Sequence, residues 1–224
     1  MSSEARSKWN PVKKIMGNPK VHLGRHLSYW WENTPRSALY FMSHYKFAAK
    51  MIGVDKRVLD VGCAEGLGTW LLALEGGHAK GIDIDMQAID IGKKNWRDPR
   101  ISFECNDHIF KMKQDQYDAV VSFDVIEHII PKNVDTFMRL IVDRLSENGV
   151  SIIGTPSLTG QTYASEVSKA GHVNVYSAER LEEEMLQYFE HVFLFCANDE
   201  VIHTGYTQMA HYYIAMGCKK RSNY

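Results

Sequence analysis

Residues 57–68, RVLDVGCAEGLG, combine an apolar run with an acid and three glycines, and a segment of helical character (69–74) follows directly. This order predicts the first strand, turn and helix of a nucleotide-binding α/β unit, in which the missing glycine side chains let the backbone approach a ligand closely. Dinucleotide-binding domains begin in a similar way. The stretch therefore predicts the local fold but leaves the ligand open.

After this stretch, apolar and helical segments alternate along the chain. We expect strands at 57–61, 79–84, 100–104, 118–123 and 149–155, separated by helices at 68–75, 86–96 and 132–146. Strands that alternate with helices of this length predict a parallel sheet with helices on both faces. The pair Asn148-Gly149 is expected to end the helix before the fifth strand.

The two ends of the chain follow other patterns. Residues 1–33 are expected to be irregular, and a helix is expected from about Pro35 to Met51 with Asn33 or Thr34 as its cap. Residues 156–176 show no clear period and predict a loop. A helix at 178–188 with Ser177 as N-cap and strands at 191–197 and 208–217 would complete the sheet.

The bulk composition narrows the class of protein. The 224 residues are within the range of one domain, and the net charge of −1 gives no general attraction to nucleic acid or to a membrane. A local excess of basic residues at the start predicts a solvated arm. The four scattered cysteines form no Cys-x-x-Cys pair, and no apolar run is long enough to span a membrane, so we expect a cytoplasmic protein without a membrane partner.

Two further segments extend the pattern of residues 57–68. Residues 81–85 place an acid at the end of the second strand, and residues 117–128 end in Asp124, Glu127 and His128. In this order and spacing the three segments resemble a class I S-adenosylmethionine (SAM)-dependent methyltransferase over about residues 55–217. The resemblance implies a Rossmann-like, doubly wound α/β fold whose seven-stranded sheet has its last strand antiparallel. It also divides the chain into an N-terminal lid or helical segment (1–50) and a methyltransferase domain (51–224).

The resemblance also implies a cofactor site. Gly62, Gly66 and Gly68 would let the methionine part of SAM pass close to the main chain, and Asp83 would accept hydrogen bonds from both ribose hydroxyls. Asp107 would pair with the adenine amino group, and Ile84 and His108 would flank the adenine ring. The full set of expected cofactor contacts is Asp60, Gly62, Cys63, Ala64, Gly66, Gly68, Asp83, Ile84, Asn106, Asp107, His108 and Phe123. Ala64 departs from the glycine usual in the family, and the G-x-x-x-G-x-G turn differs from the dinucleotide G-x-G-x-x-G, which favours SAM over NAD.

Asp124, Glu127 and His128 suggest a metal site. If a helix starts near Phe123, they lie on one face at i, i+3 and i+4, and two carboxylates with an imidazole suit Mg²⁺ or Mn²⁺, with iron and zinc as further candidates. The run resembles the E-x-x-E-H motif of ubiquinone-type catechol O-methyltransferases and small-RNA 3′-terminal 2′-O-methyltransferases, with Asp124 in place of the first Glu. In those groups a second His completes the site, which implies His172 here. Many methyltransferases carry Glu-His at this point and bind no metal. In that case His128 or His172 would act as general base.

The acceptor side is less defined by the sequence. An aromatic N-terminal segment offers Arg25, His26 and Tyr29, and residues 198–206 offer His203 and Tyr206. The chain is similar to methyltransferases of surface-polysaccharide loci in the segments 22–24, 45–50, 154–156, 171–174 and 198–201. That similarity implies O-methylation of a small polar acceptor, such as a sugar, phosphoramidate or nucleotide-linked precursor, by a protein that could form a homodimer. The alternatives are an RNA 2′-O-methyltransferase, for which the basic groove is missing, a catechol O-methyltransferase, a non-catalytic SAM-binding subunit and a dehydrogenase.

Overall fold

An eight-stranded mixed sheet forms the centre of the protein in a computed structural model that describes residues 3–75, 77–106 and 116–222. The strands are β1 (Lys56–Val61), β2 (Gly77–Asp83), β3 (Ile101–Cys105), β4 (Tyr117–Phe123), β5 (Leu145–Pro156), β6 (Phe189–Asn198), β7 (Val201–His203) and β8 (Tyr212–Lys220). Their order across the sheet is β3-β2-β1-β4-β5-β8-β6-β7. The first five strands pair in parallel, and β8 runs antiparallel to both β5 and β6. This confirms the expected α/β fold and the antiparallel last strand, and it adds the short edge strand β7 to the seven strands expected.

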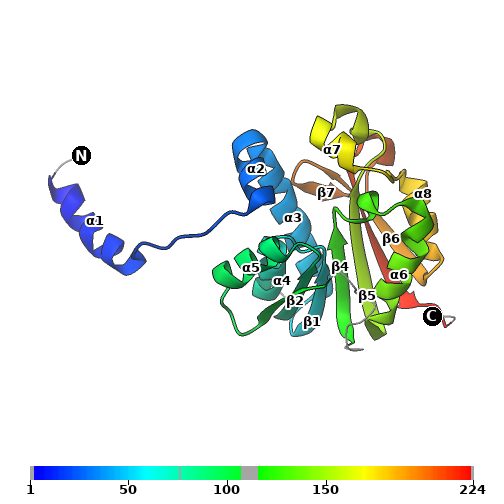
Figure 1. Ribbon diagram of the computed structural model, residues 1–224, viewed down its shortest axis with the longest axis horizontal. Helices are drawn as coiled ribbons and strands as arrows, with labels where there is room; N and C mark the ends of the chain where they lie inside the picture. The colour runs from blue at the N-terminus through cyan, green and yellow to red at the C-terminus, as the bar shows by residue number, and fades with distance from the viewer. Residues whose placement is uncertain (1–2, 76, 107–115, 223–224) are drawn as a thin grey trace.

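Helices cover both faces of this sheet (Figure 1). The helices of the main body are α2 (Arg25–Asn33), α3 (Pro35–Ile52), α4 (Leu67–Glu75), α5 (Met86–Asn95), α6 (Val134–Asp143), α7 (Glu166–Gly171) and α8 (Ala178–Leu186). One apolar cluster joins α3 and α4 to the sheet through residues such as Tyr45 and Leu72. A second cluster joins α6 and α8 to the opposite face through residues such as Met138 and Leu181. The sheet is therefore buried on both sides, as its near-continuous apolar strands predict.

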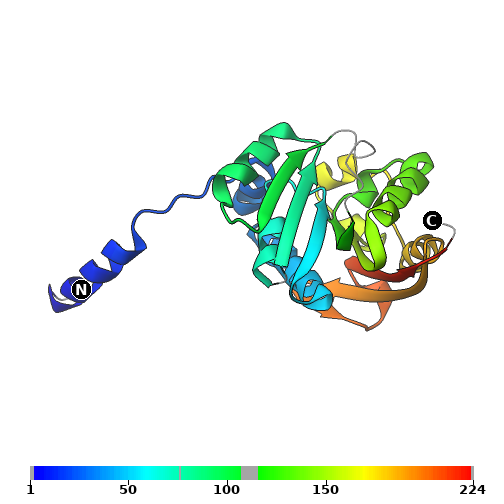
Figure 2. The same cartoon turned by 90° about the horizontal axis from the view of Figure 1, so that it is seen from below.

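The N-terminal region corrects the sequence prediction. Residues 1–33 were expected to be irregular, but helices α1 (Ser3–Met16) and α2 form there. The break between them at 17–24 contains Gly17, Pro19 and Gly24, which interrupt the helical conformation. Helix α1 stands away from the main body in both views (Figures 1 and 2). The division at residue 50 stays a prediction, since α3 also contributes side chains to the core of the sheet. Within the described residues, no helix is long and apolar enough to cross a membrane.

Two further expectations about local structure are wrong. Asn148-Gly149 does not end a helix, because α6 already ends at Asp143 and β5 begins at Leu145, with a register shift against β4 that absorbs the extra residues. No regular helix starts at Phe123 either. Asp124 adopts a left-handed conformation (φ 56°), and only a short 3₁₀ helix, η2 (Ile126–His128), follows. The expected loop at 156–176 contains a 3₁₀ turn and α7, whereas Ser177 caps α8 as predicted, with its side chain accepting a hydrogen bond from the Arg180 amide.

Candidate active site

The turn between β1 and α4 is held against the end of β2. The amides of Gly62 and Cys63 both donate to the Ile82 carbonyl oxygen, at 2.9 and 3.1 Å. Gly62 (φ 81°) and Ala64 (φ 45°) are both left-handed, so Ala64 accepts a conformation in which glycine is less strained. A Cβ at Gly62 would lie 2.2 Å from Val125, in the segment that leads to the Glu127–His128 turn. The glycine thus lets the turn lie close to the end of β4.

Asp83 has its carboxylate fixed by the main chain. One oxygen accepts a hydrogen bond from the Ala64 amide and the other from the Asp85 amide, both at 2.8 Å. The cap of α5 is Asp85, whose side chain accepts from the Gln87 and Ala88 amides. Asp83 is therefore not the cap of α5. Its half-buried carboxylate lies beside the glycine turn, and the ribose contact stays a prediction.

The other expected cofactor residues lie in different surroundings. Asp60 is completely buried, accepts hydrogen bonds from Thr69 (2.6 Å) and Tyr45 (3.0 Å), and has its pKa raised to about 7 by burial, so it ties β1 to α3 and α4. Four of them are buried, whereas Ile84 is exposed; the buried residues are Cys63, Gly66, Gly68 and Phe123. The Asn106 amide donates to the Asp83 carbonyl oxygen. Asp107 and His108 lie outside the described residues.

Helix α2 is attached to the glycine turn through Glu65, a residue that the sequence reading did not select. Its buried carboxylate accepts a hydrogen bond from the His26 amide at 2.9 Å and lies 3.4 Å from the His26 ring. This contact raises the pKa of His26, because the carboxylate stabilises the imidazolium form. His26, expected on the acceptor side, contacts the protein's own Glu65, and Arg25 and Tyr29 lie beside it on the exposed side of α2.

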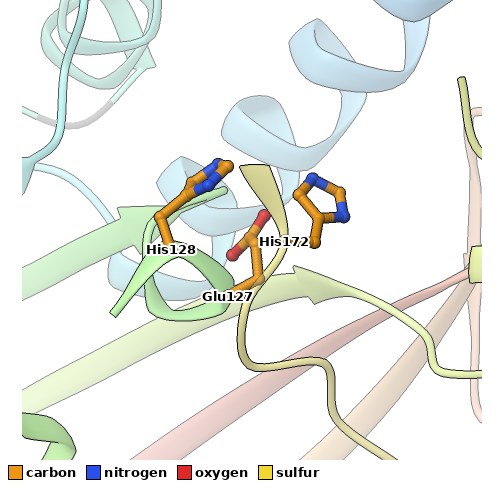
Figure 3. A group of neighbouring side chains, drawn as sticks. All are labelled: Glu127, His128 and His172. Carbon is orange, nitrogen blue, oxygen red and sulfur yellow. The ribbon is translucent and has the colours of Figure 1, made fainter. Parts of the chain in front are cut away.

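Glu127, His128 and His172 form a cluster at the carboxyl ends of β4 and β5. One side-chain donor atom from each lies within 4.8 Å of the others, and the group is brought together from the η2 turn and the loop after α7 (Figure 3). The centroids of the two imidazole rings are 5.1 Å apart. The sequence predicted these three residues as metal ligands together with Asp124, and the structure places the three as a group.

The hydrogen bonds of the cluster leave specific atoms free to bind a ligand. Nδ1 of His128 lies 2.8 Å from the Gly171 carbonyl oxygen, which can only accept, so Nδ1 is the donor, and in the neutral form of the ring the lone pair is on Nε2. Nδ1 of His172 lies 2.9 Å from Oε1 of Gln161, which has the same consequence. Glu127 is fully buried, with one oxygen accepting from Thr155 at 3.2 Å and Oε1 without a hydrogen-bond partner in the part of the chain that the structure describes. Burial, with Asp124 nearby, raises the pKa of Glu127 well above its usual value.

Asp124 does not join this group. Its left-handed backbone turns it away from the helical i, i+3, i+4 arrangement that was predicted, and the cluster of donor atoms does not include it. Burial raises the pKa of Asp124 to about 6. The phenol of Tyr212, which no sequence pattern indicated, lies near enough for the two groups to affect each other's ionisation, although its hydroxyl makes no hydrogen bond of good geometry. Tyr212 reaches this position because β8 begins opposite the end of β5.

The loop between β7 and β8 gives no support for an acceptor site. Both ring nitrogens of His203 are used within the loop, with Nε2 at 2.7 Å from Asn198 and Nδ1 accepting from the Gly205 amide at 2.9 Å. Tyr206 is largely exposed and contacts Gln208. These contacts are those of an ordinary loop that is held by its own side chains. An acceptor role for His203 or Tyr206 stays a prediction.

The parallel sheet, the antiparallel β8 and the glycine turn beside an acid define the class of protein as an α/β, Rossmann-like methyltransferase fold. A family model described as a methyltransferase domain matches residues 30–188, and the chain belongs to this family. The ubiquinone biosynthesis O-methyltransferase of Rickettsia bellii is 31% identical over 121 residues, which are 53% of this chain and 50% of the relative. The chain thus matches about half the length of that protein.

Solved structures agree with this fold. A TehB-like SAM-dependent methyltransferase from Corynebacterium glutamicum superimposes with a TM-score of 0.62 at 17% identity, over 97% of this chain and 98% of the other. Magnesium protoporphyrin IX methyltransferase from Synechocystis, with bound S-adenosylhomocysteine (SAH), gives a TM-score of 0.59 at 14% identity, over 97% and 95% of the two chains. At such identities the likeness establishes the fold alone.

Proposed function

We propose that the chain is a SAM-dependent O-methyltransferase that activates its acceptor at a divalent metal site formed by Glu127, His128 and His172. The observation that carries this proposal is the cluster itself, which lies at the same edge of the sheet as the glycine turn and Asp83. Ligands of open parallel sheets bind at the carboxyl ends of the strands. A methyl donor at one part of this edge and an acceptor at the other would be adjacent.

The donor set fits a metal ion. The Nε2 atoms of the two imidazoles and one oxygen of the buried Glu127 carboxylate are three potential ligand atoms that bond to none of the residues the structure describes. Two nitrogens and one oxygen suit Mn²⁺, Fe²⁺ or Zn²⁺ better than Mg²⁺, which prefers oxygen ligands. Three protein ligands would leave positions open for an acceptor.

The roles of the chain's residues follow from this arrangement. Asp83 would hold the ribose, because its carboxylate is oriented by two amides beside the glycine turn. When bound, SAM supplies an electrophilic methyl group on its sulfonium. A divalent ion supplies a lowered acceptor pKa and a fixed position for the acceptor oxygen. The protein aligns donor and acceptor for in-line displacement, and Glu65 holds α2 over the glycine turn.

For the acceptor, we propose a small polar molecule such as a sugar, phosphoramidate or nucleotide-linked precursor of a surface polysaccharide. A ubiquinone-type catechol is the second candidate, and the relationship to ubiquinone biosynthesis O-methyltransferases supports it. Both acceptors present a hydroxyl oxygen, so the site chemistry is the same. A non-catalytic SAM-binding role would leave the Glu127–His128–His172 cluster without a purpose.

Calorimetric titration tests the cofactor and metal parts separately. Chelator-treated protein is titrated with SAH and with Mn²⁺, and the variants Glu127→Ala and His128→Ala are compared with His203→Ala, which removes a histidine outside the cluster. We expect SAH binding in every variant and Mn²⁺ binding in all but the two cluster variants. Absence of SAH binding would overturn the proposed SAM-dependent activity. SAH binding without Mn²⁺ binding would remove the metal and leave His128 or His172 as general base.

The acceptor is tested by transfer of a labelled methyl group from SAM. Nucleotide-linked sugars and a simple catechol are assayed in parallel, each with and without Mn²⁺. Labelling of the sugars alone supports the first candidate, and labelling of the catechol alone replaces it with the second. No transfer to either class, in a protein that binds SAH, would favour the non-catalytic subunit.

A further inference from the structure

The segment that carries His172 is fastened to the turn that carries Glu127 and His128. The Glu127 carbonyl oxygen accepts two hydrogen bonds, from the Val173 amide at 2.9 Å and from the Asn174 amide at 3.0 Å. These bonds connect main chain to main chain only. They set the spacing of the two segments, to which the contact of the His128 ring with the Gly171 carbonyl oxygen adds a second link.

The side chain of Asn174 adds the constraint that the main chain lacks. It is buried, and its amide nitrogen donates to the Ile126 carbonyl oxygen at 3.3 Å and to the Tyr176 hydroxyl at 3.0 Å. Its carbonyl oxygen accepts from the Arg180 guanidinium at 2.5 Å. Asn174 therefore connects the η2 turn, the His172 segment and helix α8 through a single carboxamide.

Arg180 fixes the other end of this connection. One guanidinium nitrogen donates to Asn174 and a second donates to the Val175 carbonyl oxygen at 2.8 Å, while the guanidinium carbon lies 4.1 Å from the centre of the Tyr176 ring. Arg180 lies in the first turn of α8, next to the Ser177 cap. The planar guanidinium makes both hydrogen bonds and the ring contact at once, which the single ammonium of lysine cannot do.

We infer that Asn174 and Arg180 are positioning residues that set the affinity of the Glu127–His128–His172 site for a divalent ion, although neither belongs to the donor cluster. This inference rests on the proposed metal site and adds the residues that hold its ligands in register. Outer-shell partners of metal ligands commonly change metal affinity by about 10- to 100-fold. Here they act on the backbone that carries His172, whose ring itself bonds to Gln161 and packs against His128.

The test uses the full chain with Asn174→Ala and Arg180→Lys, and Arg139→Ala as a matched control. Arg139 is an arginine of α6 that pairs with Asp135 at the surface, and its replacement removes none of the hydrogen bonds of Asn174 and Arg180 given above. Mn²⁺ affinity and SAH affinity are measured by calorimetry on the same samples, and folding is followed by circular dichroism. Arg180→Lys keeps the charge and is the second variant should Asn174→Ala fold poorly.

We expect Mn²⁺ to bind about 10- to 100-fold more weakly to Asn174→Ala and to Arg180→Lys, with SAH affinity unchanged within about twofold. A purely structural role would lower thermal stability but leave Mn²⁺ affinity in the folded variants within about threefold of wild type, and that result would overturn the inference. Wild-type protein that binds SAH but no Mn²⁺ would overturn both the metal site and this inference. If both variants bind Mn²⁺ as tightly as wild type does, the metal site stands and only the positioning role is overturned.

Discussion

His128 and His172 approach each other with ring centroids 5.1 Å apart and planes inclined by 69°, and each ring uses Nδ1 to donate to an oxygen from the loops after β5. Gly171 accepts from one ring and Gln161 from the other. The same loops thus orient both imidazoles. A change in these loops is expected to alter the two ligands together.

The ligand set of the cluster gives the first prediction. Asp124→Asn should retain Mn²⁺ binding within a few fold, because Asp124 is outside the group and Asn tolerates the left-handed conformation. His172→Ala should abolish it, because the third donor is lost. Calorimetry with Mn²⁺ distinguishes the two variants. Equal loss in both would restore Asp124 as a ligand.

Asp83 and its neighbour Asp85 give the second prediction. Asp83→Asn should weaken SAH binding by about 10-fold or more, since an amide nitrogen would face a backbone N–H and the carboxylate proposed to accept from the ribose would be lost. Asp85→Asn should change it little, because asparagine is also a good N-cap. The comparison is made by titration with SAH. Similar losses in the two variants would point to the β2–α5 loop as a whole rather than to the Asp83 carboxylate.

The contact between α2 and the glycine turn gives the third prediction. A Cβ at Gly24 would lie 2.2 Å from the Glu65 carboxylate oxygen, so Gly24→Ala should displace α2. The expected result is faster hydrogen–deuterium exchange in residues 22–33, measured against wild type at the same pH. Gly53→Ala is the control for replacing a glycine at a helix boundary: among the described residues nothing lies within 4 Å of its Cβ position, so its effect comes from the left-handed backbone (φ 86°) at the end of α3 and should leave exchange in residues 22–33 unchanged. Unchanged exchange in Gly24→Ala would show that α2 is held by its contacts with α3 alone.

His44 gives a prediction about acid stability. Its buried ring stacks on Tyr212 and lies near Phe123 and His211, and burial lowers its pKa to about 3. The unfolded chain takes up a proton below its usual pKa of about 6.5 whereas the folded protein does not, so stability falls as the pH drops from about 6.5 toward 3. Between about pH 6.5 and 4.5 this group alone should remove about 2 kcal/mol.

The measurement compares denaturant unfolding of wild type and His44→Phe across that range. The variant keeps an aromatic ring against Tyr212 and cannot be protonated. Its free energy of unfolding should fall less steeply with acid than that of wild type. Parallel pH curves for the two proteins would contradict the assignment of acid sensitivity to His44.

Much of the fold could be predicted from alternation in the sequence, because each buried strand is a short apolar run and each helix has its own period. The N-terminal helices could not, since α1 buries little of its surface and leaves no apolar periodicity tied to the sheet. The end of α6 was misplaced because the bulge in β5 places Asn148-Gly149 inside a strand, where turn residues usually do not occur.

The site was predicted in part. Glu127, His128 and His172 were found from residue types and family spacing, but the role of Asp124 depended on a helix that its left-handed backbone prevents. Glu65 and Tyr212 gave no signal, because one is an acid inside a glycine turn and the other reaches the site only through the pairing of β8 with β5. Such contacts follow from topology, which local sequence does not encode.

The place of β8 in the sheet has a consequence for biosynthesis. Strands β1 to β5 can assemble as they leave the ribosome, whereas β6 has no partner strand among them and must wait for residues 212–220 to emerge and enter between it and β5. Until then the open edge of β5 is exposed to other chains. A nascent protein of this fold therefore passes through a stage at which a chaperone is most useful, just before its last strand is made.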